Sequence, residues 1–191
     1  MQITATEFPG LAVIAPKVHQ DERGFFLETF RRDLFEAAGL RLDFVQANHA
    51  RSGKAGVLRG LHYQAPPAAQ AKLVWVTAGE VSDVVVDLRQ GSPTFGRHFS
   101  IVLTAANFVR LLIPKGFAHG YLTLTPGVEF QYMVDAYYAP GHEQGLLWND
   151  PDLGIDWPEL DLIMAERDKT WPRLKNITSP FLFVPDAGVW A

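Results

Sequence analysis

Short apolar segments separated by turn-forming residues dominate the middle of this chain. The pattern predicts strands at residues 41–50, 56–63, 71–77, 81–88, 98–103, 108–113, 120–124 and 128–134. Glycine and proline punctuate the gaps, as in Pro66-Pro67 and Thr125-Pro126-Gly127. Short strands that recur every 8–12 residues or so with such turns indicate an antiparallel sandwich or barrel.

Helical periodicity is weak by comparison. Residues 30–38 place Leu34, Phe35 and Ala38 at helical spacing and end at Gly39, so a short helix is expected there. A second short helix is expected at residues 159–164. The fold class is therefore mainly β, with a few short helices.

The length of 191 residues favours a single domain covering residues 1–191. No long repeat, linker or low-complexity tract divides it. Residues 173–191 form a tail that is unusually apolar, with Phe181, Phe183 and Trp190. We expect this tail to pack on the body of the domain or on a partner subunit.

Charge and composition exclude several classes of function. The net charge is -4 and no run of basic residues occurs, which argues against binding nucleic acid through its phosphates. The chain has no cysteine, which excludes disulfides, zinc–thiolate sites and cysteine nucleophiles. Its N-terminus lacks the pattern of a signal peptide, and no stretch approaches the roughly 18 apolar residues of a membrane helix. A cytoplasmic enzyme without membrane contact is expected.

The densest run of candidate residues is GVLRGLHYQ, which contains His62. A regular strand would place Arg59, Leu61 and Tyr63 on the face opposite His62. A bulge at Gly60 would instead re-aim these side chains. A lone histidine in a strand is more often a hydrogen-bonded core residue. Lys72, His119 and Tyr132 on later strands favour a site, because a barrel would bring them inside with His62.

A second run, IPKGFAHG, contains Pro114, Gly116 and His119 in the spacing Pro-x-Gly-x-x-His. This spacing resembles the second signature of the cupin barrels, and the predicted fold is a cupin-type antiparallel barrel, or jelly roll. The first cupin signature has His-x-His and then a glutamate seven residues before a glycine. Here glutamine occupies the second histidine position, at Gln64, and Lys72 occupies the glutamate position.

These replacements change the expected chemistry. Imidazole and carboxylate groups bind divalent cations, whereas an ammonium repels them. Lys72 therefore suggests a cupin without a metal, in which the ammonium itself stabilises a developing oxyanion. A metal-dependent cupin, such as an isomerase or dioxygenase, remains an alternative if His49, His62 and His119 cluster.

At these residues the chain resembles the dTDP-4-dehydrorhamnose 3,5-epimerases, a metal-free branch of the cupin barrels. The matching runs are DERGFFLETF at residues 21–30, QANH at 46–49, residues 56–64, QAKLV at 70–74, GEV at 79–81, VDLR at 86–89, SPTFG at 92–96, residues 114–120 and WNDP at 148–151. They follow one another in unbroken order and are part of a resemblance that covers roughly residues 5 to 172.

The resemblance implies a dTDP-linked 4-keto-6-deoxy sugar as substrate, whose C4 carbonyl acidifies the C3 and C5 hydrogens. By the family's pattern His62 is the base and Asp168 pairs with it. Lys72 faces the C4 oxygen and stabilises the enolate, and Tyr132 returns the proton from the opposite face. Histidine suits a base because its unperturbed pKa is near 6.5. No cofactor is implied.

The resemblance also implies a set of substrate-binding residues. They are Arg23, Phe26, Glu28, Gln46, Asn48, Arg59, His119, Tyr138, Glu143 and Arg167. Guanidinium groups suit diphosphate oxygens, and the aromatic rings suit the thymine or sugar. Relatives form homodimers with crossing N-terminal segments, so Arg23, Phe26 and Glu28 are expected to reach the neighbour's pocket.

Some residues differ from the family's pattern, and two other functions remain as alternatives. Ala47, Ala50 and the run Met133-Val134-Asp135 replace more polar residues of the family, which bears on the substrate more than on the reaction. One rival is an epimerase that acts at C3 or C5 only, and another is a sugar-binding barrel without catalysis. Motifs for nicotinamide, ATP or serine hydrolase chemistry do not occur.

Overall fold

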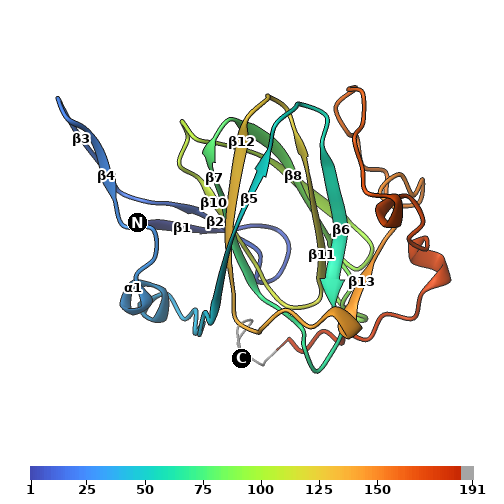
Figure 1. Cartoon of the computed structure of the whole chain (residues 1–191). Coiled ribbons are helices and arrows are strands. Elements are labelled where there is room, and N and C mark those ends of the chain that lie inside the picture. The colour runs from blue at the N-terminus through green and yellow to red at the C-terminus, as the bar shows by residue number, and fades with distance from the viewer. Residues whose placement is uncertain (186–191) are drawn as a thin grey trace.

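Two antiparallel sheets face each other in the computed structural model, which describes residues 1–185 (Figure 1). The six-stranded sheet contains, in spatial order, β1 (Gln2–Ala5), β2 (Ala12–Ala15), β10 (Arg110–Ile113), β7 (Lys72–Ala78), β12 (Val128–Val134) and β5 (Gln46–Ser52). The five-stranded sheet contains β13 (Glu143–Gly145), β6 (Leu58–Gln64), β11 (Phe117–Thr123), β8 (Glu80–Asp87) and β9 (His98–Thr104). This is the predicted jelly-roll barrel, and the expectation of a mainly β fold is confirmed.

Three clusters of buried apolar residues form the core, one between the sheets and one on the outer side of each sheet. The first lies between the sheets and includes Val74, Val85 and Phe130. The second contains Leu73 and Trp75, which alternate with Val74 and therefore lie on the outer face of the six-stranded sheet. The third covers the outer face of the five-stranded sheet with residues from the C-terminal third of the chain. Strand alternation thus buries both faces of central strands such as β7 and β8, whereas β5 and β9 keep exposed positions.

The strands predicted from the apolar pattern occur close to their expected bounds in the barrel. Four differ by two or more residues in their starts. β6 begins at Leu58, two residues later than expected, and β11 begins at Phe117, three residues earlier. Residues 41–45 precede β5 without strand structure, and β10 begins at Arg110, after Phe108 with a φ of 56°. The N-terminal strands β1 and β2, and the separate hairpin of β3 (Val18–Asp21) and β4 (Gly24–Leu27), were not predicted.

The helices are short and lie outside the barrel. The expected helix at residues 30–38 is present as α1 (Arg32–Ala37), and three 3-10 turns follow: η1 (Pro140–His142), η2 (Glu166–Lys169) and η3 (Leu174–Asn176). The expected helix at residues 159–164 is wrong. Ile163 instead forms a parallel bridge with Val57, with hydrogen bonds from Ile163 N to Gly56 O and from Leu58 N to Ile163 O. Pairing with the edge of β6 satisfies backbone groups that a helix would have used internally.

The N-terminal hairpin and the C-terminal part of the chain lie in different positions relative to the barrel. The β3–β4 hairpin projects away from the barrel, whereas the C-terminal part runs along the outside of β6 (Figure 1). Within the tail, Phe181 is buried and Phe183 N donates to Gln90 O, so the tail contacts the body as far as Phe183. Trp190 lies outside the described residues. Among residues 1–185, no helix has the length and apolar character needed to span a bilayer.

Candidate active site

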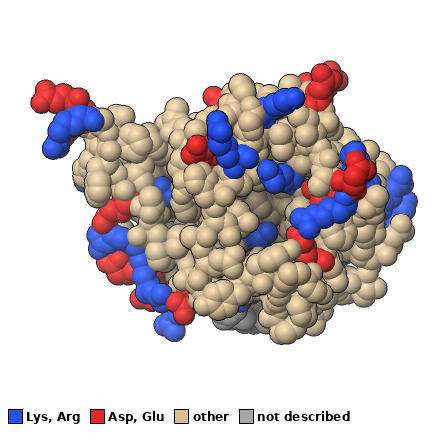
Figure 2. Space-filling model, viewed as in Figure 1, with Lys and Arg blue, Asp and Glu red and all other residues tan. Residues whose placement is uncertain are grey.

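A cavity of about 630 Å³ opens into the barrel between the two sheets. Figure 2 shows a hollow on this face of the molecule, with basic and acidic side chains around it. Most of the predicted site residues line the cavity: Gln46, Asn48, Arg59, His62, Lys72, His119, Tyr132, Tyr138, Glu143, Arg167 and Asp168. They come from β5, β6, β7, β11, β12, β13 and η2, and from the loop after β12. Segments far apart in the sequence therefore converge on one space.

A bulge in β6 aims two of these side chains into the cavity. His62 pairs with His119 and Arg59 pairs with Tyr121, so two residues of β6 lie opposite the single Gly120. Gly60 has a φ of 132°, and a Cβ there would lie 2.5 Å from the Gly120 Cα. Only glycine fits this close approach.

The bulge corrects the face assignment of a regular strand. Arg59 and His62 both line the cavity, whereas Leu61 and Tyr63 join the apolar cluster on the outer face. The expectation that Arg59 would share a face with Leu61 and Tyr63 is therefore wrong, and the alternative of a bulge at Gly60 is confirmed.

His62 forms a tight pair with Asp168 of η2. Their Nε2 and Oδ1 atoms are 2.7 Å apart, and Asp168 is buried. Burial opposes ionisation of Asp168, but the hydrogen bond from His62, supported by Gly60 N and Trp171 Nε1, keeps its pKa below the ordinary value. An ionised Asp168 can only accept hydrogen bonds, so Nε2 of His62 carries hydrogen and Nδ1 is the basic nitrogen.

Lys72 at the start of β7 places a positive charge in the wall of the cavity. Burial lowers its pKa to about 8, and the negative charges of Asp83 and Glu143 oppose that shift. The ammonium is therefore retained at neutral pH but is close to its titration. Such a charge can stabilise an oxyanion that forms inside the cavity.

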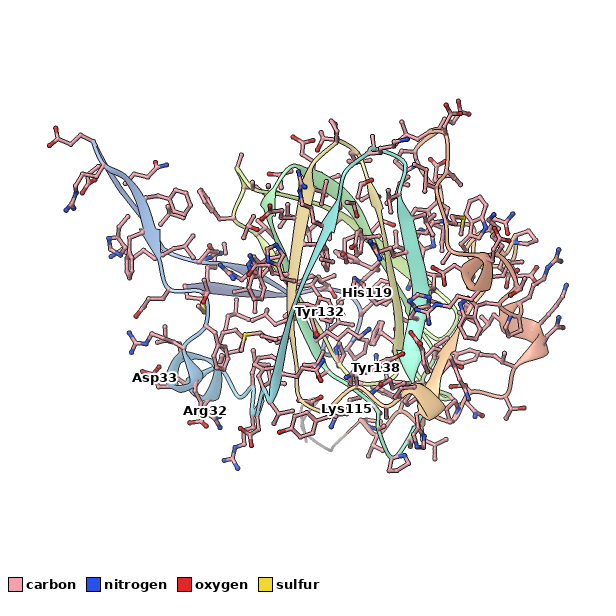
Figure 3. The ribbon with its side chains drawn as sticks, viewed as in Figure 1. Arg32, Asp33, Lys115, His119, Tyr132 and Tyr138 are labelled. Atoms are coloured by element: carbon pink, nitrogen blue, oxygen red, sulfur yellow. The ribbon has the colours of Figure 1, made fainter. Side chains whose placement is uncertain are left out.

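Tyr132 lies on β12, in the sheet that faces the strand of His62. Figure 3 shows it inside the barrel together with His119. Burial raises the pKa of Tyr132, and the nearby Arg59 partly offsets this rise. A phenol with a raised pKa keeps its proton at neutral pH and is available as a proton donor.

His119 is paired with Asp83, a residue that was not among the predicted site residues. Nε2 of His119 lies 2.9 Å from Oδ2 of Asp83, and both residues are buried. The sequence does contain a signal, because Asp83 interrupts the apolar run of β8 between Val81 and Val84. A charged residue in the middle of a buried strand needs a partner.

A polar rim surrounds the cavity. Arg167 Nη1 donates to Oε2 of Glu143 at 2.8 Å, and the hydroxyl of Tyr138 donates to the same oxygen at 2.8 Å. Gln46 Oε1 accepts from Tyr138 N, and Gln46 Nε2 donates to Asn48 Oδ1. Tyr138 is about half exposed, so its ring presents a flat apolar surface next to these polar groups.

Three predicted residues lie elsewhere. Arg23, Phe26 and Glu28 are on or just after the β3–β4 hairpin and are absent from the lining of their own chain's cavity. Arg23 is paired with Asp21, and the Phe26 side chain is 65% exposed.

The three-histidine cluster that a metal site would require does not form. His49 is paired with Glu129 at 3.2 Å, is largely exposed and does not line the cavity, unlike His62 and His119. Within the described part of the chain, no group of three or more His, Cys, Asp or Glu residues is arranged to hold a metal ion. The clustering of His49, His62 and His119, on which the metal-dependent alternative depended, is therefore not found.

Several lining residues were not predicted as site residues: Ala50, Val57, Leu58, Gln70, Gly120, Tyr121, Phe130, Ile163, Met164 and Ala165. Most are apolar and look like core residues in the sequence. Tyr121 is distinctive, because its ring stacks on Phe130 at 4.1 Å and burial raises its pKa to about 12.

The fold and the cavity define a cupin-type barrel that contains a histidine–aspartate pair, a lysine and a tyrosine. A sequence profile described as dTDP-4-dehydrorhamnose 3,5-epimerase matches residues 5–176. The chain belongs to this family.

Individual relatives agree with the family assignment. The chain is 48% identical over 171 residues to dTDP-4-dehydrorhamnose 3,5-epimerase of Pseudomonas aeruginosa, covering 88% of this chain and 93% of that one. It is 47% identical over 169 residues to the enzyme of that name from Shigella flexneri, with the same coverage. A solved 3,5-epimerase from Legionella pneumophila, in complex with dTDP-4-keto-L-rhamnose, matches with a TM-score of 0.90 and 43% identity over 95% of this chain and 96% of that chain.

Proposed function

We propose that this chain epimerises C3 and C5 of a dTDP-linked 4-keto-6-deoxyhexose and so converts dTDP-4-dehydro-6-deoxyglucose to dTDP-4-dehydrorhamnose. The observation that carries this proposal is the His62–Asp168 pair, which lies in one cavity with Lys72 and Tyr132. The relatives that are 46–48% identical bear the name of the same activity. The reaction belongs to the synthesis of dTDP-rhamnose.

The proposed chemistry is proton transfer next to a ketone. Nδ1 of His62 takes the proton from C3 or C5, and Asp168 stabilises the resulting imidazolium. The electron pair of the C–H bond moves into an enolate, whose negative charge on the C4 oxygen is stabilised by Lys72. Tyr132 then gives its proton to the carbon from the opposite face, and both side chains return to their starting state by proton exchange with water.

The polar rim is proposed to hold the nucleotide. Arg59 and Arg167 supply guanidinium groups for the diphosphate, and His119 adds a ring at the inner wall. Tyr138 is proposed to pack against the thymine, because its ring is about half exposed at the edge of the cavity. Gln46, Asn48 and Glu143 complete the polar lining.

We further propose a homodimer that acts as one unit in the cytoplasm, in which Arg23, Phe26 and Glu28 complete the partner's site. The exposed position of Phe26 on a projecting hairpin supports this arrangement. The whole chain, residues 1–191, is proposed to be one domain with residues 173–191 as a tail. The burial of Phe181 supports the packing of this tail on the body.

Incubation with dTDP-4-keto-6-deoxyglucose in deuterated water, followed by NMR of the sugar protons, tests the function. Deuterium at both C3 and C5, with inversion at both, is expected. Deuterium at one carbon alone would favour the epimerase of a different deoxysugar, a class represented among the solved structures by a 3'-monoepimerase from Streptomyces bikiniensis that is 36% identical. If neither carbon exchanges its hydrogen, both the 3,5-epimerase and the single-carbon epimerase would be refuted.

A further inference from the structure

A buried carboxylate beside the cavity is not used by the reaction as described. Asp83 lies on β8, opposite Tyr121 of β11, and is 0% exposed. Its Oδ2 accepts the hydrogen bond of His119, but its Oδ1 has no hydrogen-bond donor among the described residues. One oxygen of a fully buried carboxylate therefore depends on nearby positive charge for its stability.

We propose that Asp83 is a positioning residue of the cavity, which fixes the ring of His119 and keeps the ammonium of Lys72 charged. This inference rests on the proposed function, because it assigns Lys72 as the group that faces the developing enolate. The proposal adds Asp83, which lies behind the cavity wall and acts through His119 and Lys72.

The geometry around His119 supports the first half of the proposal. Asp83 holds Nε2, and the ring lies 6.1 Å from Phe130 at an interplanar angle of 29°. Hydrogen bonding on one nitrogen and stacking on one face leave the imidazole little rotational freedom. If Asp83 accepts from Nε2, Nδ1 is the nitrogen of His119 that remains for a ligand.

The charges around Lys72 support the second half. No carboxylate lies within ion-pair distance of Lys72 among residues 1–185, and Asp83 and Glu143 are the two whose charges counter its burial. Glu143 already receives hydrogen bonds from Arg167 and Tyr138. Asp83 has the free oxygen, and it is the larger of the two influences. The other titratable or charged groups that line the cavity with Lys72 are Arg59 and His62 of β6, His119 and Tyr121 of β11, Tyr132 of β12, Tyr138, and Arg167 and Asp168 of η2.

The direct test is to titrate Lys72 in the folded protein. The chain has six lysines, at positions 17, 54, 72, 115, 169 and 175, so lysine side-chain NMR after reductive ¹³C-methylation gives few signals, and Lys72→Arg identifies the relevant one. In the wild type this signal should titrate near pH 8. In Asp83→Asn it should titrate lower by about one pH unit, the size of shift that a nearby opposite charge produces.

A matched control removes a different buried carboxylate. Asp150 is 2% exposed, accepts from Leu174 N and does not line the cavity, so Asp150→Asn should leave the Lys72 titration unchanged. If Asp83→Asn does not fold, Asp83→Ser offers a smaller neutral side chain at the same position. A Lys72 titration in either folded Asp83 variant that matches the wild type would overturn the proposal.

Activity provides a second readout. The alkaline limb of the kcat profile should move to lower pH in Asp83→Asn, so that lowering the pH restores part of the lost rate. A uniform loss at every pH would point to a purely structural role and would contradict the proposal. The titration does not need turnover. Failure of the wild type to epimerise would therefore refute the proposed function, and an unshifted Lys72 would refute the role of Asp83.

Discussion

At the scale of single residues, the proposed proton abstraction depends on the pair of His62 and Asp168. The structure gives His62 a free Nδ1 and a negative partner on Nε2. His62→Ala should lower kcat by about 10²–10⁴-fold, since a positioned base contributes that much, while most binding contacts remain. Turnover and binding of dTDP by calorimetry measure the two effects separately. Near-normal turnover in the variant would exclude His62 as the base.

Lys72 should give the reaction its alkaline limit. Because burial lowers its pKa to about 8, the ammonium is present below that pH and is lost as the pH rises through it. We expect kcat to fall above about pH 8 in the wild type. Lys72→Arg keeps a positive charge that does not titrate in this range, so any activity it retains should lack this limb. A limb that stays in place in this variant would assign it to another group.

Trp171 should tune the same base from outside the lining. Its ring packs edge-on against His62 at 6.1 Å, its Nε1 donates to Asp168 Oδ1, and Gly145 leaves room for it. Trp171→Phe keeps an aromatic ring but loses the donor, so kcat should fall by roughly fivefold, equivalent to about 1 kcal/mol. The pH profile of kcat and the KM of Trp171→Phe should change little. If kcat is unaffected, the N–H of Trp171 does not support the pair.

At the scale of elements, β6 shows where a short glycine signal becomes a site. The bulge lets Arg59 and His62 point into the same cavity, and it requires glycine at both contacting positions. Gly60→Ala should destabilise the fold by about 2–4 kcal/mol, because its Cβ would meet the Gly120 backbone at 2.5 Å. Gly53→Ala, where nothing lies within 4 Å, is the control and should be neutral. Equal denaturant midpoints for the two variants would contradict this account.

The elements also show what the sequence could predict. The long strands β7, β8 and β12 contain enough apolar residues to be recognised from the sequence pattern alone. The hairpin of β3 and β4 has mostly exposed residues, so its pattern carries no burial signal. The prediction of a helix at residues 159–164 failed for a different reason. Ile163 pairs with Val57, which is about 100 residues away in the sequence, and a local pattern cannot reveal such a contact.

The site divides in the same way. His62, Lys72 and Tyr132 lie on predicted strands, and His119 directly precedes the one predicted at residues 120–124. A barrel was enough to suggest that they converge. Asp168 is on a short polar turn, ERDK, which has no local pattern that marks it as buried. Only the family resemblance identified it before the structure placed it beside His62. Asp83 had a local signal, a charge within an apolar strand, but its partner could not be read from the sequence.

At the scale of the whole molecule, the site of one chain is incomplete by the family's pattern. The cavity contains the proposed acid and base, but Arg23, Phe26 and Glu28 lie on a hairpin that points away from it. In Figure 3, His119 and Tyr132 lie inside the barrel, and Arg32 and Asp33 of α1 lie outside it, on the side from which the hairpin projects. In a two-fold dimer each chain would give its hairpin to the other, since an isologous interface makes such exchanges reciprocal.

Complementation between two inactive variants tests this exchange. One variant carries Arg23→Ala and Glu28→Ala, and the other carries His62→Ala. In a mixed dimer, the cavity of the first chain would receive the intact hairpin of the second, which gives one complete site. If mixing is statistical, half of the dimers are mixed and each has one complete site of two, so about a quarter of wild-type activity should return. Co-expression with two different tags, followed by an epimerase assay of the pooled protein, measures this fraction, and the mixed dimer isolated through both tags should show about half of the wild-type activity. The control pairs His62→Ala with Lys72→Ala, two changes within one cavity, and should recover nothing. No recovery with the hairpin variant would show that each chain builds its site alone. Recovery in the control would contradict the placement of His62 and Lys72 in one cavity of one chain.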